Sequence, residues 1–151
     1  MKLLFLDIDG VLNNRSFLSS AFSKHDGDEQ VNHLDPAAIE QLNRIVDETS
    51  CLVVLSSAWR MFGLGQVQRW LRARGYRHRL MGETPMKISG IRGHEIDLYL
   101  KTLSDQPESF CILDDSRDIY PHEENWVWCD PNVGLTAANA DDAIKMLNSA
   151  G

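Results

Sequence analysis

The strongest constraint on the fold is a short apolar run without alternation, CLVVLSS at residues 51–57. A strand with one face in water alternates apolar and polar side chains, whereas a strand in a parallel sheet is covered on both faces and is apolar throughout. Residues 2–8, KLLFLDI, and residues 109–116, SFCILDDS, have the same character. The sequence therefore predicts several buried strands in a mainly parallel sheet.

Segments with helical periodicity separate these apolar runs. In residues 34–50, Asp35 is a predicted N-cap and Pro36 takes the first helical position. Residues 13–33 are polar and mixed, and we expect a loop or flap there. Further helices are expected at 65–75, 92–103 and 136–150, the last capped by Thr136, and further strands at 76–82 and 125–130. This alternation predicts one α/β domain over residues 1–151, a Rossmann-like three-layer sandwich.

Charge and composition limit the classes of partner. The formal net charge of −7 argues against strong non-specific binding to nucleic acid, which needs many phosphate-facing cations. No apolar stretch is long enough to span a membrane, and Asp7 and Asp9 interrupt the N-terminal apolar run before a signal peptide could form. The three cysteines are expected to be buried reduced thiols. Together these features favour a cytoplasmic location.

Carboxylates follow two of the predicted strands. Asp7 and Asp9 end the first strand, and Asp114 and Asp115 end the strand at 109–116. Any one of these acids alone could be a turn or cap residue. Ligands of an open parallel sheet bind beyond the carboxyl ends of its strands, so we expect all four acids in one crevice. Their repulsion requires a cation, and this set of oxygen ligands predicts Mg²⁺ and a phosphorylated substrate.

Three motifs in this order resemble the haloacid dehalogenase (HAD) superfamily of phosphotransferases. FLDIDGVLN at 5–13 matches its DxDG signature, VVLSS at 53–57 its strand-terminal serine or threonine, and ILDD at 112–115 its terminal acid pair. The motifs VVLSSAWR, RGHEI and DPNVGLT resemble those of small HAD domains associated with RNA-repair proteins. The resemblance covers nearly the whole chain and implies a HAD-like fold. The intervals between the motifs are too short for a large cap domain, so we expect an open site.

The resemblance implies a role for each acid. Asp7 would be the nucleophile that forms an aspartyl-phosphate, and Asp9 the general acid and base. Mg²⁺ would bind the carboxylate of Asp7, the main-chain carbonyl of Asp9, and Asp115, with Asp114 sharing the metal or holding a water. Gly10 would permit the tight turn that follows the strand and lies against the substrate.

Two assignments remain open within this resemblance. Ser56 or Ser57 would hydrogen-bond the transferring phosphoryl group, and Ser56 is preferred because it lies directly at the strand end. Arg92 or Lys87 would balance the charge of the transition state. Arg92 fits the start of the helix before the last acidic strand, and Lys87 lies five residues earlier.

Trp59 and Arg60 complete the motif SSAWR. They could contact a base or a distal phosphate of the substrate. Equally, Trp59 could pack on the sheet edge and Arg60 could be a surface arginine.

These features predict a Mg²⁺-dependent phosphomonoester hydrolase, with nucleic-acid ends or nucleotides as the expected substrates. One alternative is a non-catalytic, phosphate- or Mg²⁺-responsive binding module, comparable to a signalling receiver domain. It is disfavoured because Asp7 and Asp9 lie together on one strand. A second alternative is a domain that works only within a larger assembly. The oligomeric state is left open.

Overall fold

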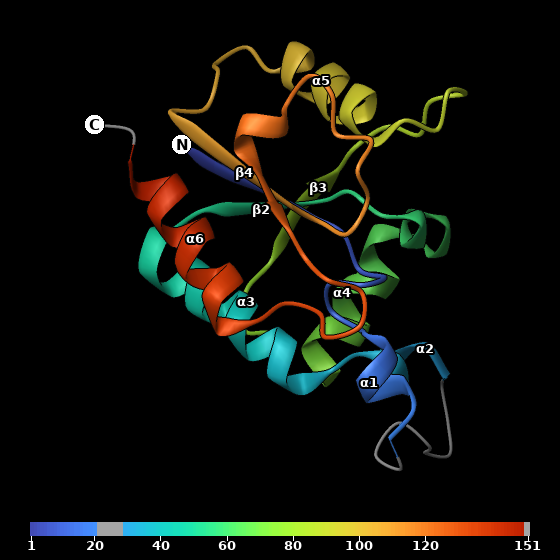
Figure 1. Ribbon diagram of the computed structural model, residues 1–151. Helices are drawn as coiled ribbons and strands as arrows, with labels where there is room; N and C mark the ends of the chain where they lie inside the picture. Colours follow the sequence, from blue (N-terminus) through green and yellow to red (C-terminus); the bar gives the residue numbers. More distant parts are fainter. Residues whose placement is uncertain (21–28, 150–151) are drawn as a thin grey trace.

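Parallel strands form the centre of the computed structural model, which describes residues 1–20 and 29–149 (Figure 1). Their order in the sheet is β3-β2-β1-β4-β5, and every neighbouring pair is parallel. The mainly parallel sheet is thus confirmed, and the three strands that precede the predicted site residues lie side by side. The strands are β1 (Lys2–Leu6), β2 (Leu52–Leu55), β3 (Leu80–Glu83), β4 (Ser109–Asp114) and β5 (Trp126–Trp128).

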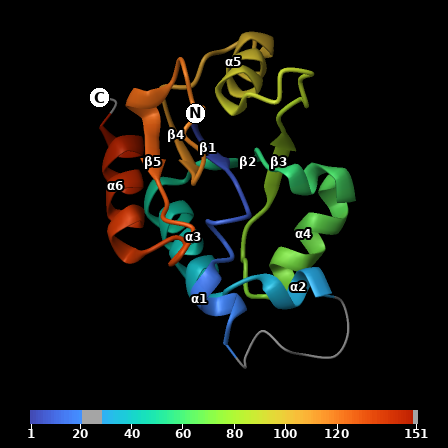
Figure 2. The ribbon, with the colours of Figure 1, turned by 45° about the vertical axis from the view of Figure 1, so that its right-hand side comes forward.

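Helices cover both faces of this sheet (Figure 2). Leu4 and Leu6 of β1 point into a core shared with α3 (Pro36–Thr49), α4 (Leu64–Ala73) and α6 (Ala137–Asn148). Leu3 and Phe5 point to the opposite face, where α5 (Arg92–Thr102) covers a smaller core. Because both faces are covered, β1 is apolar without alternation. The predicted three-layer α/β sandwich is confirmed.

The segment expected as a loop or flap contains helix. α1 (Arg15–Leu18) and α2 (Glu29–His33) lie within residues 13–33, whereas residues 21–28 of the expected flap fall outside the described part of the chain. α1 begins there because the side chain of Asn14 accepts a hydrogen bond from the backbone N–H of Phe17, a cap that stabilises the first turn. Two short 3₁₀ turns, η2 (Ala58–Phe62) and η3 (Glu123–Asn125), complete the described elements. No separate cap domain occurs within residues 1–20 or 29–149.

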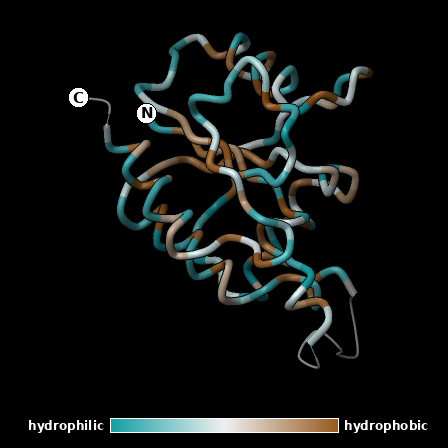
Figure 3. Tube along the Cα trace, in the orientation of Figure 1, coloured by the Kyte–Doolittle hydropathy of each residue, from teal (hydrophilic) through white to brown (hydrophobic). Residues whose placement is uncertain are grey.

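The most hydrophobic stretches of the chain lie in the central strands, between the layers of helices (Figure 3). All three cysteines are buried free thiols, as predicted. Among the residues that the structure describes, no helix combines the length and the apolar character needed to cross a bilayer.

The start of α5 touches the loop that follows β4. The N–H of Gly93 donates to the carbonyl of Asp118 over 2.9 Å, and a Cβ at Gly93 would overlap the carbonyl oxygens of Ile119 and Tyr120. We expect Gly93→Ala to lower the free energy of unfolding by about 2–3 kcal/mol, because helix and loop must separate. Urea unfolding measures this loss. Gly65→Ala, whose methyl group meets nothing nearer than 3.6 Å, is the control and should keep full stability.

Candidate active site

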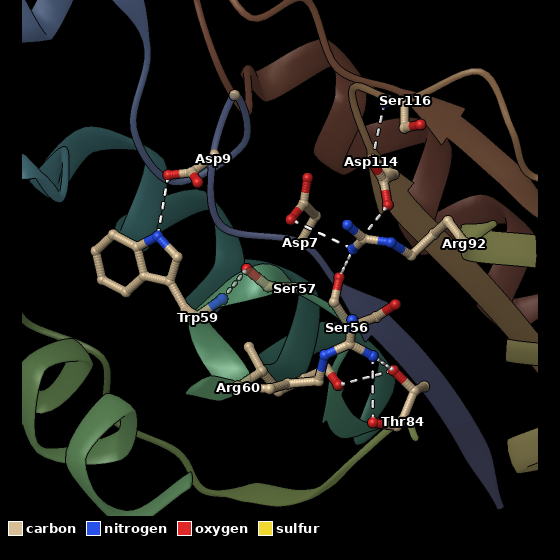
Figure 4. Close-up of polar contacts among 12 residues, drawn as sticks. Asp7, Asp9, Ser56, Ser57, Trp59, Arg60, Thr84, Arg92, Asp114 and Ser116 are labelled. Carbon is tan, nitrogen blue, oxygen red and sulfur yellow. Dashed lines mark hydrogen bonds and ion pairs between the residues drawn. The ribbon is translucent and has the colours of Figure 1, made fainter. Parts of the chain in front are cut away.

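The predicted acids and serines lie at the carboxyl ends of β1, β2 and β4 (Figure 4). Beyond the strand ends, the N–H of Asp7 donates to the carbonyl of Leu113 over 3.0 Å. The N–H of Ser56 likewise donates to the carbonyl of Leu6 over 2.8 Å. The parallel ladder therefore continues into the site and holds Asp7 between Ser56 and Asp114.

Three carboxylates form the centre of the site. Asp7, Asp114 and Asp115 each offer one oxygen, and these oxygens lie within 4.8 Å of one another. Asp7 and Asp114 are buried, at 4% and 0% exposure. Burial, and secondly the charge of Asp114, raise the pKa of Asp7 well above its ordinary value. Burial also raises the pKa of Asp114 to about 6. The ionised forms of these carboxylates therefore need a compensating cation.

Arg92 supplies one such charge from the first residue of α5. Its Nη1 lies 3.4 Å from Oδ1 of Asp7 and 3.3 Å from Oδ2 of Asp114, and it donates to the carbonyl of Ser56. Burial opposes the charged guanidinium, but Asp114 and Asp7 outweigh it and raise the pKa of Arg92. Lys87 is exposed in the loop before α5, and its backbone N–H bonds to Glu95. The structure brings Arg92, rather than Lys87, to the carboxylates.

The donor set fits a hard divalent cation. Oδ1 of Asp114 accepts the N–H of Ser116 over 2.9 Å, whereas its buried Oδ2 accepts no hydrogen bond from the described residues and lies 3.3 Å from Nη1 of Arg92. A buried carboxylate oxygen beside two further carboxylates is suited to Mg²⁺. The carboxylate of Asp9 is not part of this cluster. Its predicted contribution, a main-chain carbonyl ligand, stays a prediction.

Gly10 brings the turn after β1 against the metal-ligand candidates. Its φ is +83°, which favours glycine, and a Cβ there would overlap the carboxylate of Asp115. Its N–H donates to Oδ1 of Asn13 over 2.9 Å. Gly10 therefore allows Asp115 to approach the turn, and a direct contact with substrate stays a prediction.

The two serines have different surroundings. The hydroxyl of Ser57 caps η2, where it accepts the backbone N–H of Trp59 over 3.1 Å. The hydroxyl oxygen of Ser56 is buried and has no hydrogen-bond partner among the residues that the structure describes. An unpaired buried hydroxyl beside the carboxylates is available to a ligand. The geometry favours Ser56 over Ser57 for the phosphoryl contact.

Trp59 points inward rather than toward a substrate surface. Only 6% of it is exposed, and its ring packs edge-to-face against Phe62 and Trp70. Its indole N–H donates to Oδ1 of Asp9 over 3.0 Å, and Nδ2 of Asn13 donates to the same oxygen over 2.8 Å. Of the two roles that the sequence allowed, packing describes Trp59, and stacking with a base does not.

Arg60 is neither a surface arginine nor a free ligand for phosphate. Its side chain is 7% exposed, and its guanidinium forms an ion pair of 3.1 Å with Glu95. It also donates to the hydroxyl of Thr84 over 2.7 Å. Glu95 in turn lies 3.9 Å from Nε of Arg92. The structure therefore places Arg60 as a buried support for the Glu95–Arg92 pair.

Sequence reasoning missed the contacts by which three residues orient the site, namely those of Asn13, Glu95 and Asp118. Glu95 follows Arg92 by three positions, a spacing at which helical side chains meet, so this pair had a local signal. Asn13 lies in the tight turn after the acid pair. Asp118 accepts the backbone N–H of Arg92 over 3.3 Å, a contact between distant segments that no local pattern indicates.

The parallel sheet carries an acid pair after β1, serines after β2 and acids at the end of β4, and α5 begins with a cation. Together these features define a HAD-like domain. Comparison with known families agrees. The chain belongs to the family described as the HAD domain in Swiss Army Knife RNA repair proteins, which it matches over residues 3–140. No match to a curated protein is found. The predicted family is thus confirmed, and it supports a phosphatase-like function.

Proposed function

We propose that this protein is a Mg²⁺-dependent phosphomonoester hydrolase that acts through an aspartyl-phosphate on Asp7. The observation that carries the proposal is the convergence of three carboxylates on one point, with the guanidinium of Arg92 beside them. This arrangement offers a nucleophile together with the positive charge that a transferring phosphoryl group requires. Membership of the HAD family supports the same reaction class.

The residues take distinct parts in the reaction. A carboxylate oxygen of Asp7 attacks phosphorus while the bond to the leaving oxygen breaks, and Asp9 protonates that oxygen. Water then attacks the aspartyl-phosphate, gives its proton to Asp9, and releases phosphate. Arg92 and the hydroxyl of Ser56 bind the phosphoryl oxygens. Mg²⁺, held by Asp7, Asp114, Asp115 and the carbonyl of Asp9, would neutralise the carboxylates and phosphoryl oxygens.

For the substrate, we propose a phosphorylated nucleic-acid end. The family description names RNA repair. Trp128 is 41% exposed, and its indole N–H donates to the backbone carbonyl of Asp115 over 3.1 Å, so a partly open aromatic ring contacts the backbone of a predicted site residue. The guanidinium of Arg117 lies 5.2 Å from the centre of that ring. Aromatic and arginine side chains of this kind bind nucleobases by stacking.

Phosphate release from a substrate panel tests the proposal. The panel contains 4-nitrophenyl phosphate, mononucleotides, 5′- and 3′-phosphorylated oligonucleotides and a phosphopeptide, each with Mg²⁺ and with EDTA. We expect Mg²⁺-dependent release, greatest from oligonucleotides. Release that survives exhaustive chelation would reject the metal assignment. Mg²⁺ binding without release from any substrate would favour the binding module, and release only with an added partner would favour the assembly-dependent domain.

Mg²⁺ is also expected to stabilise the fold. At a concentration 100-fold above its dissociation constant it should add about 2.7 kcal/mol to the free energy of unfolding. Thermal unfolding with and without Mg²⁺ measures this shift, and Asp114→Asn should largely remove it. Asp105→Asn, at an exposed position outside the carboxylate cluster, is the control and should keep the shift. An equal shift in the wild type, Asp114→Asn and Asp105→Asn would mean that Mg²⁺ binds outside the carboxylate cluster.

A further inference from the structure

We propose that Trp59 and Asn13 are positioning residues that determine which oxygen of Asp9 exchanges protons with the substrate. Both side chains donate to Oδ1 of Asp9, Trp59 over 3.0 Å and Asn13 over 2.8 Å. Oδ2 accepts neither bond and is left for the leaving group. The inference rests on the proposed function, in which Asp9 is the general acid and base.

The amide of Asn13 is held in one orientation. It is 5% exposed, and its Oδ1 accepts the N–H of Gly10 over 2.9 Å. A backbone N–H can only donate, so the atom facing Gly10 must be the oxygen, and the NH₂ group faces Asp9. Asn13 therefore presents a donor to Asp9 in every state of the carboxyl group.

The indole of Trp59 is held from a different element. Its backbone N–H is fixed by the hydroxyl of Ser57, and its ring lies 5.8 Å from each of the rings of Phe62 and Trp70. The indole N–H is a donor only. Packing alone does not require that donor, because a phenylalanine ring would occupy the same aromatic cluster. The bond to the exposed carboxylate of Asp9 is therefore a separable property of Trp59.

Two donors at one carboxyl oxygen dictate where a proton resides. Both lone pairs of Oδ1 are used, so a proton on Asp9 occupies Oδ2. In the first half-reaction, Oδ2 gives this proton to the leaving oxygen as the phosphorus–oxygen bond breaks and the bond to Asp7 forms. In the second, Oδ2 takes a proton from water as water attacks phosphorus and the bond to Asp7 breaks. Without the two donors, the carboxyl group would be free to rotate and present either oxygen.

Substrates with different leaving groups separate this role from a structural one. An alkyl phosphate needs a proton on its leaving oxygen, whereas 4-nitrophenyl phosphate does not. We expect Trp59→Phe to lower kcat/KM for the alkyl phosphate by about 10- to 100-fold, the effect of a hydrogen bond to a charged group. The value for 4-nitrophenyl phosphate should stay close to wild type. Trp70→Phe, in the same aromatic cluster, should keep the wild-type ratio. An equal loss with both substrates, or no loss, would overturn the proposal.

A second measurement does not depend on activity. The indole ¹⁵N–¹H resonance of Trp59 is identified as the one missing from Trp59→Phe. We expect it to move clearly in Asp9→Asn, because its charged acceptor becomes neutral, while those of Trp126 and Trp128, which bind backbone carbonyls, stay in place. An unmoved Trp59 resonance would reject the contact. If the Trp59 resonance moves but the wild-type protein releases no phosphate from any substrate, the proposed function is rejected and the contact between Trp59 and Asp9 is established.

Discussion

Asp7→Asn is expected to lower Mg²⁺-dependent phosphate release by at least about 10³-fold, as removal of a nucleophile does in other enzymes. The amide has the shape of the carboxylate but forms no acyl phosphate under these conditions. Single-turnover assays with a ³²P-labelled substrate measure both release and labelling of the protein. We expect the wild type, quenched in acid, to carry label and Asp7→Asn to carry none.

The melting temperature of Asp7→Asn in EDTA, compared with that of the wild type, shows whether activity is lost because the protein unfolds or because the nucleophile is missing. Burial and the charge of Asp114 raise the pKa of Asp7, so its ionised form is unfavourable in the metal-free protein. A neutral amide should therefore leave the melting temperature unchanged or raise it. Normal turnover by a folded Asp7→Asn protein would show that another group attacks phosphorus.

Arg92→Met is expected to lower kcat/KM by about 10²–10³-fold, the usual cost of removing one charged or hydrogen-bonding group that stabilises a transition state. The side chain pairs with Asp7 and Asp114 and binds the carbonyl of Ser56, so its loss leaves two buried carboxylates with less positive charge. Steady-state kinetics with saturating Mg²⁺ measures the effect.

Lys87→Met is the matched control for this substitution. Lys87 carries the same charge but is exposed, and its backbone N–H rather than its ammonium contacts Glu95. We expect near wild-type kinetics from Lys87→Met. The reverse order of effects, with Lys87→Met severe and Arg92→Met mild, would mean that the loop before α5 closes over the substrate and brings Lys87 to the phosphate.

The parts of the fold that could be predicted depend on local signals. Asp35 and Thr136 cap α3 and α6 as expected, because capping joins a side chain to a backbone N–H two or three residues away. The order of the apolar runs and acids also predicted that Asp7, Asp114 and Asp115 come together. In a parallel sheet all the strands end at the same edge, so sequence order alone brings these side chains together.

The parts that could not be predicted depend on contacts between distant segments. Trp59 and Asp9 are separated by 50 positions, and Arg60 and Glu95 by 35. A pattern in SSAWR cannot show whether its last two side chains face solvent or the interior. The choice between Arg92 and Lys87 also depends on tertiary structure, because α5 begins where Gly93 meets the loop after β4.

The short turn η2 limits which parts of the candidate site can change without disturbing the others. Two successive side chains, Trp59 and Arg60, reach Asp9, the proposed general acid and base, on one side and, through Glu95, the proposed phosphate-binding residue Arg92 on the other. We expect an insertion or deletion in this turn to disturb both the proposed proton transfer and the proposed phosphate binding. We therefore expect substitutions that change substrate specificity to be tolerated at the exposed residues near Trp128 and in the loop before α5. The five residues of SSAWR, in contrast, should be exchanged between related proteins only together.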